Sequence, residues 1–385
     1  MDFELSKEQM DIQQAVREFV RTELTRDYLL DLERKHEFPW KAWQKACELG
    51  FVAINFPEEY GGGGYGSMEK VIVIEEFCRQ AAGVGTAITT GNFGSKIIAN
   101  RGTKEQKEKY LPLMCQGEAV TFGAFTEPDR GSDLVSSPLG TSAVKEGDYY
   151  IINGAKTFIS GANIAKFGVV LCQTDLNASP PYKGHSILIV DCPSPGFEAT
   201  EWEKMGMNSF PSCQVSFNNV KVSKDNLVGK ENEGFYYAVE FLNEVRVETA
   251  ATAVGMGQGV LDRAVEYARN RMAFGRKIGE FQAISHKIAE MATKVETARL
   301  AVYKAAWGID HKKADPKMCS IAKWYAARMA VEVADEGIEI MGGHGYMLEN
   351  DMERFYRDVR STELVEGTKE IHKNTIARAL LGKLS

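Results

Sequence analysis

A single carboxylate near the C-terminal end of the sequence has the surroundings of a group that moves protons. Glu366 stands between the apolar Val365 and Gly367. If these neighbours hold the carboxylate in a pocket, loss of hydration raises its pKa toward the range useful for a general base. The same pattern also describes a solvated glutamate in a surface loop, so both interpretations stay open at this point.

A run of glycines precedes this carboxylate and follows an apolar helical pattern. Gly342, Gly343 and Gly345 lie close together directly after Met341. Glycine has no Cβ and lets the backbone approach a ligand closely. We therefore expect a bend against which a flat, bulky group lies, with an ordinary helix end and surface loop as the alternative.

Two further stretches contain residue types that bind anions. Residues 125–133 are dense in small polar residues and turn formers, whose N–H groups and hydroxyls suit a pyrophosphate; a plain loop is the alternative. Residues 269–277 are basic within an acidic protein. Such a run usually marks a solvated helix end. The sharper alternative is a phosphate-bearing cofactor held by Arg271.

The composition of the chain narrows the class of protein in which these residues act. At 385 residues, with 44% hydrophobic and 26% charged residues, the chain has the make-up of a soluble globular protein of two or three domains. The net charge of −7 argues against nucleic acid or an anionic membrane as the main partner. No apolar run reaches membrane-spanning length.

The cysteines, the histidines and the first residues indicate the compartment. Seven scattered cysteines without a C-x-x-C pair fit reduced thiols, and the six histidines lack the spacing of metal ligands. The N-terminal residues lack the pattern of a secretory signal or a transit peptide. We expect a cytoplasmic protein with no metal and no membrane span.

Three textures follow one another along the chain and predict an α+β fold. Residues 1–118 have helical patterns, among them a capping box that begins at Ser6. Residues 119–229 are rich in short strand patterns, and residues 230–385 are helical again. A long stripe of apolar residues from Ile284 to Ile309 indicates packing in a helical bundle, and Asp315-Pro316 marks the start of the next helix. We predict an N-terminal helical domain, a middle β domain and a C-terminal four-helix bundle.

The middle region predicts an antiparallel β-barrel or sandwich. No helix pattern intervenes to cross over between parallel strands. Asn153-Gly154 lies between two β-rich runs, which is a strong signal for a hairpin turn. The alternation of Cys213, Val215 and Phe217 with polar residues indicates a strand with one wet face.

Taken together, these motifs resemble those of the acyl-CoA dehydrogenases, over nearly the whole chain. The motifs that carry the resemblance are residues 57–62, 126–128, 131–133, Arg271 with Phe274-Gly275 and Gln282, 342–346, 357–358, 366–368 and 376–378. Each motif is modest evidence, but the ordered set at these spacings is highly specific. The family's fold has an N-terminal helical domain, a middle β domain and a C-terminal four-helix bundle, as the three textures predict.

The resemblance implies FAD as cofactor, an acyl-CoA thioester as substrate and α,β-dehydrogenation as the reaction. The family's base falls on Glu366, with hydride transfer from Cβ to flavin N5 and electrons passing to an electron-transferring flavoprotein. The thioester carbonyl is expected to be polarised by the backbone N–H of the base residue and a flavin hydroxyl, as in an oxyanion hole. A homo-oligomer, usually a homotetramer, is also implied.

The family's site residues transfer to this sequence motif by motif. The expected FAD-binding residues are Phe125, Thr126, Ser132, Phe158, Ser160, Arg271, Phe274, Gln282, Glu339, Gly342, Gly343, Thr368 and Glu370. The expected substrate-binding residues on the CoA side are Ser132, Asn243, Arg246, Gly367 and Arg378. The hypothetical acyl cavity is lined by Thr86, Thr89, Phe93, Val245, Thr249 and Val365. The set from Arg271 to Gly343 is expected to hold the ADP half of the cofactor from a neighbouring subunit.

The sequence departs from the family pattern at a few of these positions. Phe158 stands where Trp is common, Ser160 where Thr is common and Asn243 where Asp is common. Arg130 stands where many members have a small residue. This arginine either reaches a CoA phosphate or is solvated, and solvation is usual for arginine in a loop.

Two rival hypotheses stay open. The first is another flavoenzyme on the same fold, either an acyl-CoA oxidase or a reductase that converts enoyl-CoA to acyl-CoA. The second is a non-enzymatic helical scaffold, which would lack the visible absorbance of flavin. The acyl specificity, whether straight, branched, cyclic or aromatic-derived, is not readable from the sequence.

Overall fold

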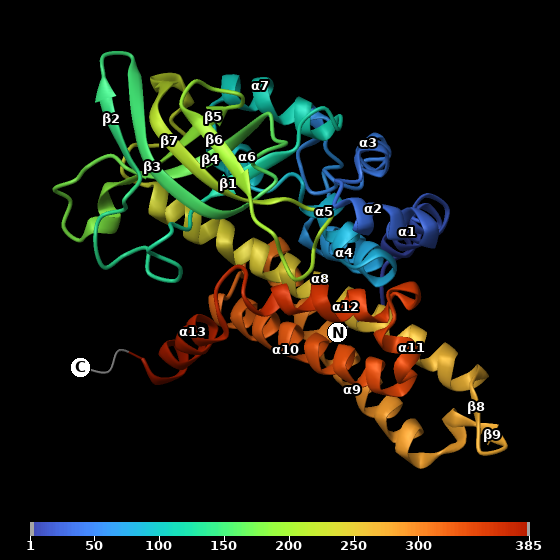
Figure 1. Ribbon diagram of the computed structural model, residues 1–385. Helices are drawn as coiled ribbons and strands as arrows, with labels where there is room; N and C mark the ends of the chain where they lie inside the picture. The colour runs from blue at the N-terminus through green and yellow to red at the C-terminus, as the bar shows by residue number, and fades with distance from the viewer. Residues whose placement is uncertain (1–3, 383–385) are drawn as a thin grey trace.

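The computed structural model describes residues 4–382, in which three regions follow one another along the chain (Figure 1). The β-sheet lies at the upper left of the figure, the first helices at the upper right, and the long C-terminal helices below both. This arrangement confirms the predicted α+β fold class, with a helical N-terminal region, a middle β region and a C-terminal helical bundle. The domain boundaries after residues 118 and 229 stay predictions.

The N-terminal region is a cluster of seven helices among the described residues. They are α1 (Lys7–Glu23), α2 (Arg26–Lys35), α3 (Trp40–Glu48), α4 (Ser67–Ala81), α5 (Gly83–Thr90), α6 (Ser95–Arg101) and α7 (Lys104–Cys115). Ser6 caps α1 as predicted, because its hydroxyl accepts a hydrogen bond from the N–H of Gln9 and the Gln9 side chain returns one to Ser6. Helix α4 is buried along most of its length, against α1 on one side and α8 on the other.

The middle region is one seven-stranded sheet in the order β1-β4-β2-β3-β7-β6, with β5 also paired to β4. Its strands are β1 (Thr121–Ala124), β2 (Ser142–Glu146), β3 (Tyr149–Ser160), β4 (Phe167–Gln173), β5 (His185–Asp191), β6 (Phe197–Glu201) and β7 (Ser212–Ser223). The predicted alternation in β7 is confirmed, since Cys213, Val215 and Phe217 are buried. Two pairings differ from the antiparallel expectation, since β1 pairs with β4 in parallel and β2 pairs with β4 in parallel at one residue pair. The β2–β3 hairpin supplies the long connection between β1 and β4 that a helix usually supplies.

The predicted hairpin turn at Asn153-Gly154 is wrong. Strand β3 runs straight through both residues, and the pairing with β7 shifts register between Ile152 and Gly154, which is a β-bulge. Gly154 has φ +138°, and a Cβ there would meet the Thr141 backbone at 2.5 Å, so the bulge itself requires glycine. The turn lies earlier, at Gly147 between β2 and β3, where φ is +60°.

The C-terminal region is built on three long helices, with shorter ones packed beside them. They are α8 (Gly234–Asn270), α9 (Gln282–Asp310), α10 (Pro316–Met341), α11 (Gly343–Tyr346), α12 (Met352–Val359) and α13 (Lys369–Leu381), with the small β8 (Met272–Ala273) and β9 (Arg276–Lys277) between α8 and α9. Asp315 caps α10 and Pro316 begins it, as predicted. The apolar stripe of α9 faces the bundle core.

One buried carboxylate joins the three regions. Asp358 in α12 accepts hydrogen bonds from the N–H of Gly83, which begins α5, at 2.9 Å and from the N–H of Met207, in the loop before β7, at 2.6 Å. Because each partner belongs to a different region, this carboxylate fixes the sheet and the first helices against the bundle.

Three further features of the described residues concern cysteines, metal ions and membrane spans. All seven cysteines are free, as expected. No group of residues among 4–382 has the geometry of a metal site. Within the same residues, no helix is both long enough and apolar enough to cross a membrane.

Candidate functional site

Glu366 lies in the short connection between α12 and α13, at a point where the backbone is bent. Its φ is +57° and that of the following Gly367 is +103°. A glutamate with positive φ is uncommon, and such strain gathers at functional sites, where the surrounding structure maintains it. The next helix begins at Lys369, with Thr368 as its N-cap.

Two basic side chains hold this bend from inside the bundle. Lys323 of α10, which is 1% exposed, donates a hydrogen bond from Nζ to the carbonyl of Gly367 at 2.9 Å. Arg246 of α8 donates from Nε to the carbonyl of Glu366 at 3.3 Å. Both cations bind backbone oxygens, and the Glu366 carboxylate itself accepts no hydrogen bond from any residue between 4 and 382.

Burial dominates the electrostatics of this carboxylate. Glu366 as a residue is only partly buried, yet the protein surrounds its carboxyl group closely enough that desolvation raises its pKa to about 7. The charges of Lys323 and Arg246 oppose this shift, and the charge of Glu248 adds to it. A carboxyl with this pKa is populated in both protonation states near neutral pH, which suits a group that takes up and returns a proton.

The neighbouring predicted residues fall into an inner and an outer set. Arg246 also donates from a guanidinium nitrogen to Asn243 Oδ1 at 3.2 Å, so these two predicted CoA contacts lie together one turn apart on α8. Glu370 and Arg378 are exposed on α13, at its first and last turns. The structure therefore gathers Glu366, Gly367, Arg246 and Asn243, and leaves the α13 residues at the rim.

The predicted cofactor residues of the sheet form a second group, at the edge where β1 and β3 end. The N–H of Thr157 donates to the carbonyl of Thr126 at 2.9 Å, which places Phe125 and Thr126 beside Phe158 and Ser160. Phe158 is 71% exposed and has φ +59°. An exposed bulky aromatic held in this conformation is typical of a surface that meets a ligand. Ser132 lies in the exposed loop that follows Thr126.

A buried ion pair fixes this edge of the sheet. Lys156, which is 0% exposed, donates to Glu127 Oε1 at 3.0 Å and to the carbonyl of Phe125 at 2.9 Å. Glu127 also accepts from the N–H groups of Gly140 and Thr141 at 2.8 and 2.9 Å. Burial raises the pKa of Glu127, but these partners outweigh it and hold that pKa below its usual value.

The expectation that Arg130 is solvated is wrong. Its guanidinium donates to the carbonyl of Ser137 at 3.1 Å and lies 4.0 Å from Glu127, with only 24% of the side chain exposed. The loop turns back on itself here and offers a carbonyl within reach, so the arginine stabilises its own loop.

The third group of predicted cofactor residues lies at the far end of the bundle. Arg271 ends α8, Phe274 forms the β8–β9 turn and is 95% exposed, and Gln282 begins α9. Glu339, Gly342 and Gly343 lie at the nearby end of α10, where nothing is within 4 Å of a Cβ built on either glycine. Tyr267 of α8 and His344 are within ring contact, at 6.0 Å, which joins the two helix ends.

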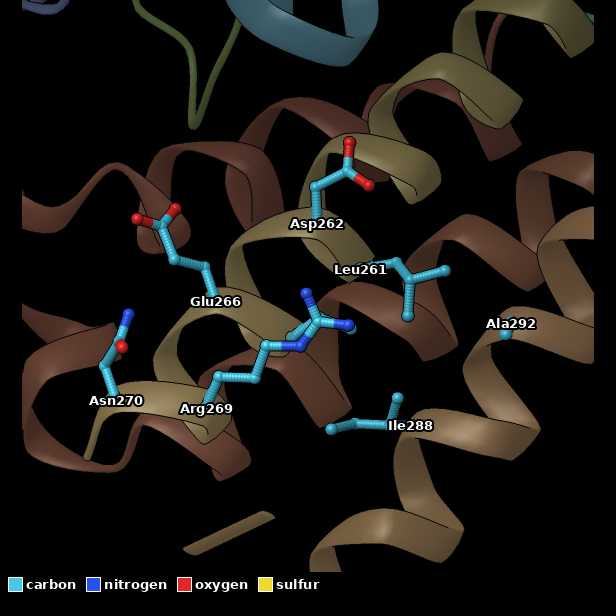
Figure 2. Close-up of a pocket in the computed structure, with 8 residues that line it drawn as sticks. Leu261, Asp262, Glu266, Arg269, Asn270, Ile288 and Ala292 are labelled. Carbon is cyan, nitrogen blue, oxygen red and sulfur yellow. The ribbon is translucent and has the colours of Figure 1, made fainter. Parts of the chain in front are cut away.

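A groove of about 480 Å³ lies beside this third group, between α8 and α9. Figure 2 shows Arg269 extending from α8 toward the space between Leu261 and Ile288, with Asp262, Glu266 and Asn270 along the same helix. Glu366 is not among the residues that line this groove.

Distance along α8 separates the third group from the first two. Residues 246 and 271 are 25 positions apart, which corresponds to roughly 38 Å at about 1.5 Å per helical residue. Phe125 of the sheet, by contrast, contacts Phe241 of α8, with ring centroids 6.0 Å apart, so the first two groups meet at this end of the helix. Figure 1 shows the same separation, with β8 and β9 at the lower right and the sheet at the upper left.

A small internal space contains two of the six residues predicted to line the acyl cavity, and the assignment of that cavity stays a prediction. Phe93 and Val245 line a cavity beside α8, together with Phe241, whose ring centroid is 5.0 Å from that of Phe93. Thr86, Thr89, Thr249 and Val365 do not line it. The hydroxyl of Thr89 is bonded to the carbonyl of Gly85 in its own helix.

The residues present fit FAD when tested against the geometry. The sheet edge offers an exposed aromatic face at Phe158 and a hydroxyl at Ser160, and the far end offers Arg271 and two open glycines. An aromatic face suits a flat ring system, and a guanidinium with free backbone approach suits phosphate. The residues of the sheet edge and those of the far end of the bundle lie far apart within one chain.

Sequence reasoning missed several polar residues that the fold brings to this region. Lys323, Lys70 and Glu248 are single charged residues within helical patterns, where charge usually means a solvated face. Burial lowers the pKa of Lys323 to about 8 and that of Lys70 below its usual value. The signal in the sequence was weak: Lys70 directly precedes the apolar run 71–74, and Lys323 follows Ala322 in an alanine-rich helix.

Comparison with known proteins gives the same assignment along the whole chain. The "Acyl-CoA dehydrogenase, N-terminal domain" matches residues 6–118, the "Acyl-CoA dehydrogenase, middle domain" residues 123–220 and the "Acyl-CoA dehydrogenase, C-terminal domain" residues 232–381. These ranges correspond in order to the helical, sheet and bundle regions.

Individual relatives extend over nearly their full lengths. The chain is 40% identical to 3-(aryl)acrylate reductase of Clostridium sporogenes, over 91% of this chain and 93% of that protein. It is 38% identical to the caffeyl-CoA reductase–Etf complex subunit CarC of Acetobacterium woodii, over 98% and 99%. The structure of butyryl-CoA dehydrogenase from Megasphaera elsdenii superimposes with a TM-score of 0.94, at 32% identity over 99% of this chain and 100% of that one.

Proposed function

The chain belongs to the acyl-CoA dehydrogenase family, whose members are FAD-dependent oxidoreductases, and from this premise we propose that Glu366 moves the α-proton of an acyl-CoA thioester. In the direction of dehydrogenation the product is the 2-enoyl-CoA. The observation that supports the proposal is a carboxylate whose backbone is fixed by two cations and whose own oxygens are left without a donor among residues 4–382.

The chemistry of the proposed step follows from what each residue holds. Glu366 takes the proton from Cα as the Cα–Cβ double bond forms. When bound, FAD supplies the acceptor for the hydride that leaves Cβ. Lys323 and Arg246 limit the movement of Glu366 through its backbone, so that the carboxylate is already in place when the thioester arrives. The positive φ of Glu366 turns its own N–H away from helical bonding, where it is available to the thioester oxygen.

The remaining site residues belong to the same proposal. Asn243, Arg246, Gly367, Arg378 and Ser132 would contact the CoA part, around the start of α8 and the rim formed by α13. Phe125, Thr126, Phe158 and Ser160 would contact the flavin side of FAD, with Thr368 and Glu370 near its ADP half. These roles rest on the resemblance of motifs and on the grouping of the residues described above.

The proposal requires more than one copy of the chain. Residues 246 and 271 are separated by roughly 38 Å along α8. We infer from this separation that the sheet edge and the far end of the bundle do not hold one cofactor within a single chain. Arg271, Phe274, Gln282, Glu339, Gly342 and Gly343 would therefore bind the ADP half of a cofactor that a second copy holds by its flavin. We propose a homotetramer, the assembly that the family resemblance implies.

The electron partner and the compartment complete the proposal. A relative bears the name of an Etf complex subunit, which favours an electron-transferring flavoprotein as the partner. Seven free thiols suit a reducing compartment, which favours a cytoplasmic location.

A second candidate is the reverse reaction, reduction of an enoyl-CoA. Three relatives are named as reductases, and one of those names specifies a caffeyl-CoA substrate. The pKa of about 7 at Glu366 supports either direction, because the protonated form is available to return a proton to Cα.

One anaerobic experiment tests the function and its direction. The purified protein should be yellow, and a matching saturated acyl-CoA should bleach the flavin absorbance in the absence of oxygen. A reductase should instead reoxidise dithionite-reduced flavin when an enoyl-CoA is added. A colourless protein, or a flavin that responds to neither class of thioester, would contradict both candidates.

A further inference from the structure

A cluster of charged and amide side chains lines the cavity beside α8. The cavity is bounded by Asn55, Phe56, Lys70, Thr90, Asn92, Phe93, Lys96, Phe241, Glu244, Val245 and Glu248. Its volume is about 20 Å³, which is enough for one group the size of a water molecule. We name it the polar cavity. Most ligand pockets are apolar with few polar groups, so four ionisable residues around so small a space need an explanation.

The two lysines of the polar cavity are already occupied. Lys70, 1% exposed, donates from Nζ to the carbonyls of Val52 at 3.0 Å and Thr89 at 2.9 Å. Lys96 donates to the carbonyl of Asn55 at 2.6 Å and lies over the Phe56 ring. Both cations are therefore fixed by backbone oxygens.

Two acceptors of the polar cavity, Asn55 and Glu248, by contrast lack donors. Asn55 is 8% exposed, and its side-chain Oδ1 has no hydrogen-bond partner. The Glu248 carboxylate accepts no hydrogen bond from the described part of the chain, and no ion pair joins it to Lys70 or Lys96. A buried acceptor without a donor costs about 1–3 kcal/mol, so the site gains from a group that donates a hydrogen bond.

The polar cavity lies where the distal end of an acyl group belongs. Phe93 and Val245 line it, and both are among the expected acyl-lining residues. Glu248 lies near enough to Glu366 that its charge raises the pKa of the latter. Val245 adjoins Arg246, which holds the backbone of Glu366. The thioester end and the polar cavity are thus joined by a single turn of α8.

We propose that the acyl group of the substrate carries a hydroxyl at its distal end, and that Asn55 and Glu248 accept its hydrogen bond in the polar cavity. A distal carboxylate would face Glu248 and Glu244, and a hydrocarbon end would leave the acceptors unsatisfied. An alcohol and a phenol share the required chemistry. This inference rests on the proposed function, since it assigns the other end of the same substrate.

Matched pairs of thioesters test the inference on the wild-type protein. The first pair is 3-(4-hydroxyphenyl)propanoyl-CoA and 3-phenylpropanoyl-CoA; the second is 6-hydroxyhexanoyl-CoA and hexanoyl-CoA. Glutaryl-CoA represents a distal carboxylate. The corresponding 2-enoyl thioesters are used if the protein acts only as a reductase. We expect kcat/KM to favour the hydroxylated member of at least one pair tenfold or more, because a site built to bond a hydroxyl rejects its absence. The responding pair distinguishes a phenol from an alcohol.

Two variants connect the preference to the polar cavity. Asn55→Leu and Glu248→Gln should each lower the ratio of kcat/KM within the responding pair at least threefold, whatever happens to the absolute rates. Glu290→Gln, on the exposed face of α9, is the matched control and should leave the ratio unchanged. Flavin content and the unfolding midpoint show whether each variant is folded.

The outcomes separate the inference from the proposed function. Equal or better turnover of both hydrocarbon members, or a preference for glutaryl-CoA, overturns the hydroxyl. If the preference for the hydroxylated thioester persists in both variants, it originates outside the polar cavity, and the assignment is overturned as well. If no thioester of any kind is turned over, the proposed function fails first. If a variant does not fold, the wild-type panel still decides.

Discussion

Two lysine–carboxylate neighbourhoods in this protein look alike in the sequence and differ in what the fold does with them. At the sheet edge, Lys156 donates directly to Glu127, and two backbone N–H groups complete the coordination of the carboxylate. In the bundle, Lys323 donates to the carbonyl of Gly367 and leaves the adjacent Glu366 carboxylate without a donor among residues 4–382. The pKa of Glu127 is lowered, whereas that of Glu366 is raised to about 7.

The difference lies in which oxygen the lysine binds. A carboxylate that accepts hydrogen bonds from a lysine and two backbone N–H groups has a structural role, since its charged form is stabilised and proton uptake is costly. A carboxylate held only through its backbone keeps its position and also keeps a nearly neutral pKa. The same pair of residue types therefore forms a structural ion pair at one site and, at the other, positions the carboxylate that we propose as the proton carrier.

The largest expected effect comes from removing the proton carrier. Glu366→Gln keeps the shape of the side chain but removes its basicity, so kcat/KM should fall by about 10⁴-fold, the upper end of what a positioned general base contributes. Turnover is measured with an artificial electron acceptor and the thioester that wild type prefers. The flavin spectrum and the unfolding midpoint should stay close to those of wild type.

A smaller loss for this variant would break the comparison. Turnover within about tenfold of wild type corresponds to only about 1.4 kcal/mol of barrier. In that case the base lies elsewhere in the chain, and the unsatisfied carboxylate of Glu366 has another explanation.

Removal of the Glu127–Lys156 ion pair should affect stability before it affects catalysis. Glu127→Ala leaves Lys156 buried and unpaired, so the free energy of unfolding should fall by about 3–5 kcal/mol. The paired variant Glu127→Gln with Lys156→Met removes both charges and should lose less than the sum of the two single variants. Denaturant unfolding measures wild type, Glu127→Ala, Glu127→Gln, Lys156→Met and the paired variant. If the losses of Glu127→Gln and Lys156→Met added up in the paired variant, the two side chains would not act as a pair.

The pH dependence of kcat/KM distinguishes the Glu366 carboxylate from that of Glu127 without any substitution. For dehydrogenation Glu366 must be deprotonated, so kcat/KM should reach a plateau above pH 7 and lie about 100-fold lower at pH 5. For reduction the protonated form is required, and kcat/KM should fall as the pH rises through 7. The sign of the slope therefore reports the chemical role of Glu366. A flat profile in both directions between pH 5 and pH 8 would contradict the raised pKa.

The fold was predictable from the sequence because its signals are local. The capping box at Ser6, the Asp315-Pro316 helix start and the alternation in β7 each depend on neighbours within a few residues, and each is confirmed. Asn153-Gly154 misled for a physical reason: the dipeptide favours positive φ, which serves a bulge in a continuous strand as well as a turn.

The site was predictable in its motif residues and not in the residues that tune them. Glu366 was recognisable from its motif, and its assigned roles stay predictions. Lys323, Glu248 and Lys70 were missed, because a charged residue in a helical pattern normally points to water, and only the packing of α4, α8 and α10 against one another buries them. Burial of this kind is a property of tertiary structure, which local periodicity does not encode.

The smallest expected effect comes from changing the lysine that fixes the backbone of the proton carrier. Lys323→Met removes the cation that lowers the pKa of Glu366, so that pKa should rise and the limb of the dehydrogenation profile should move to higher pH. The carbonyl of Gly367 also loses its donor, which costs up to about 1–3 kcal/mol. Burial has already lowered the pKa of Lys323 to about 8, so the variant no longer buries a charge, and the net loss of stability should lie at the low end.

A surface lysine of the same bundle gives the matched control. Lys294→Met breaks an ion pair with Glu332 at 2.7 Å, in which both side chains are more than a third exposed. Such pairs contribute about 0–1 kcal/mol to stability. This pair does not involve the carbonyls of Glu366 and Gly367. Its pH profile should therefore coincide with that of wild type. If Lys294→Met and Lys323→Met moved the limb equally, net charge alone would set the pKa of Glu366; if only Lys323→Met moves it, the effect is due to that specific buried cation.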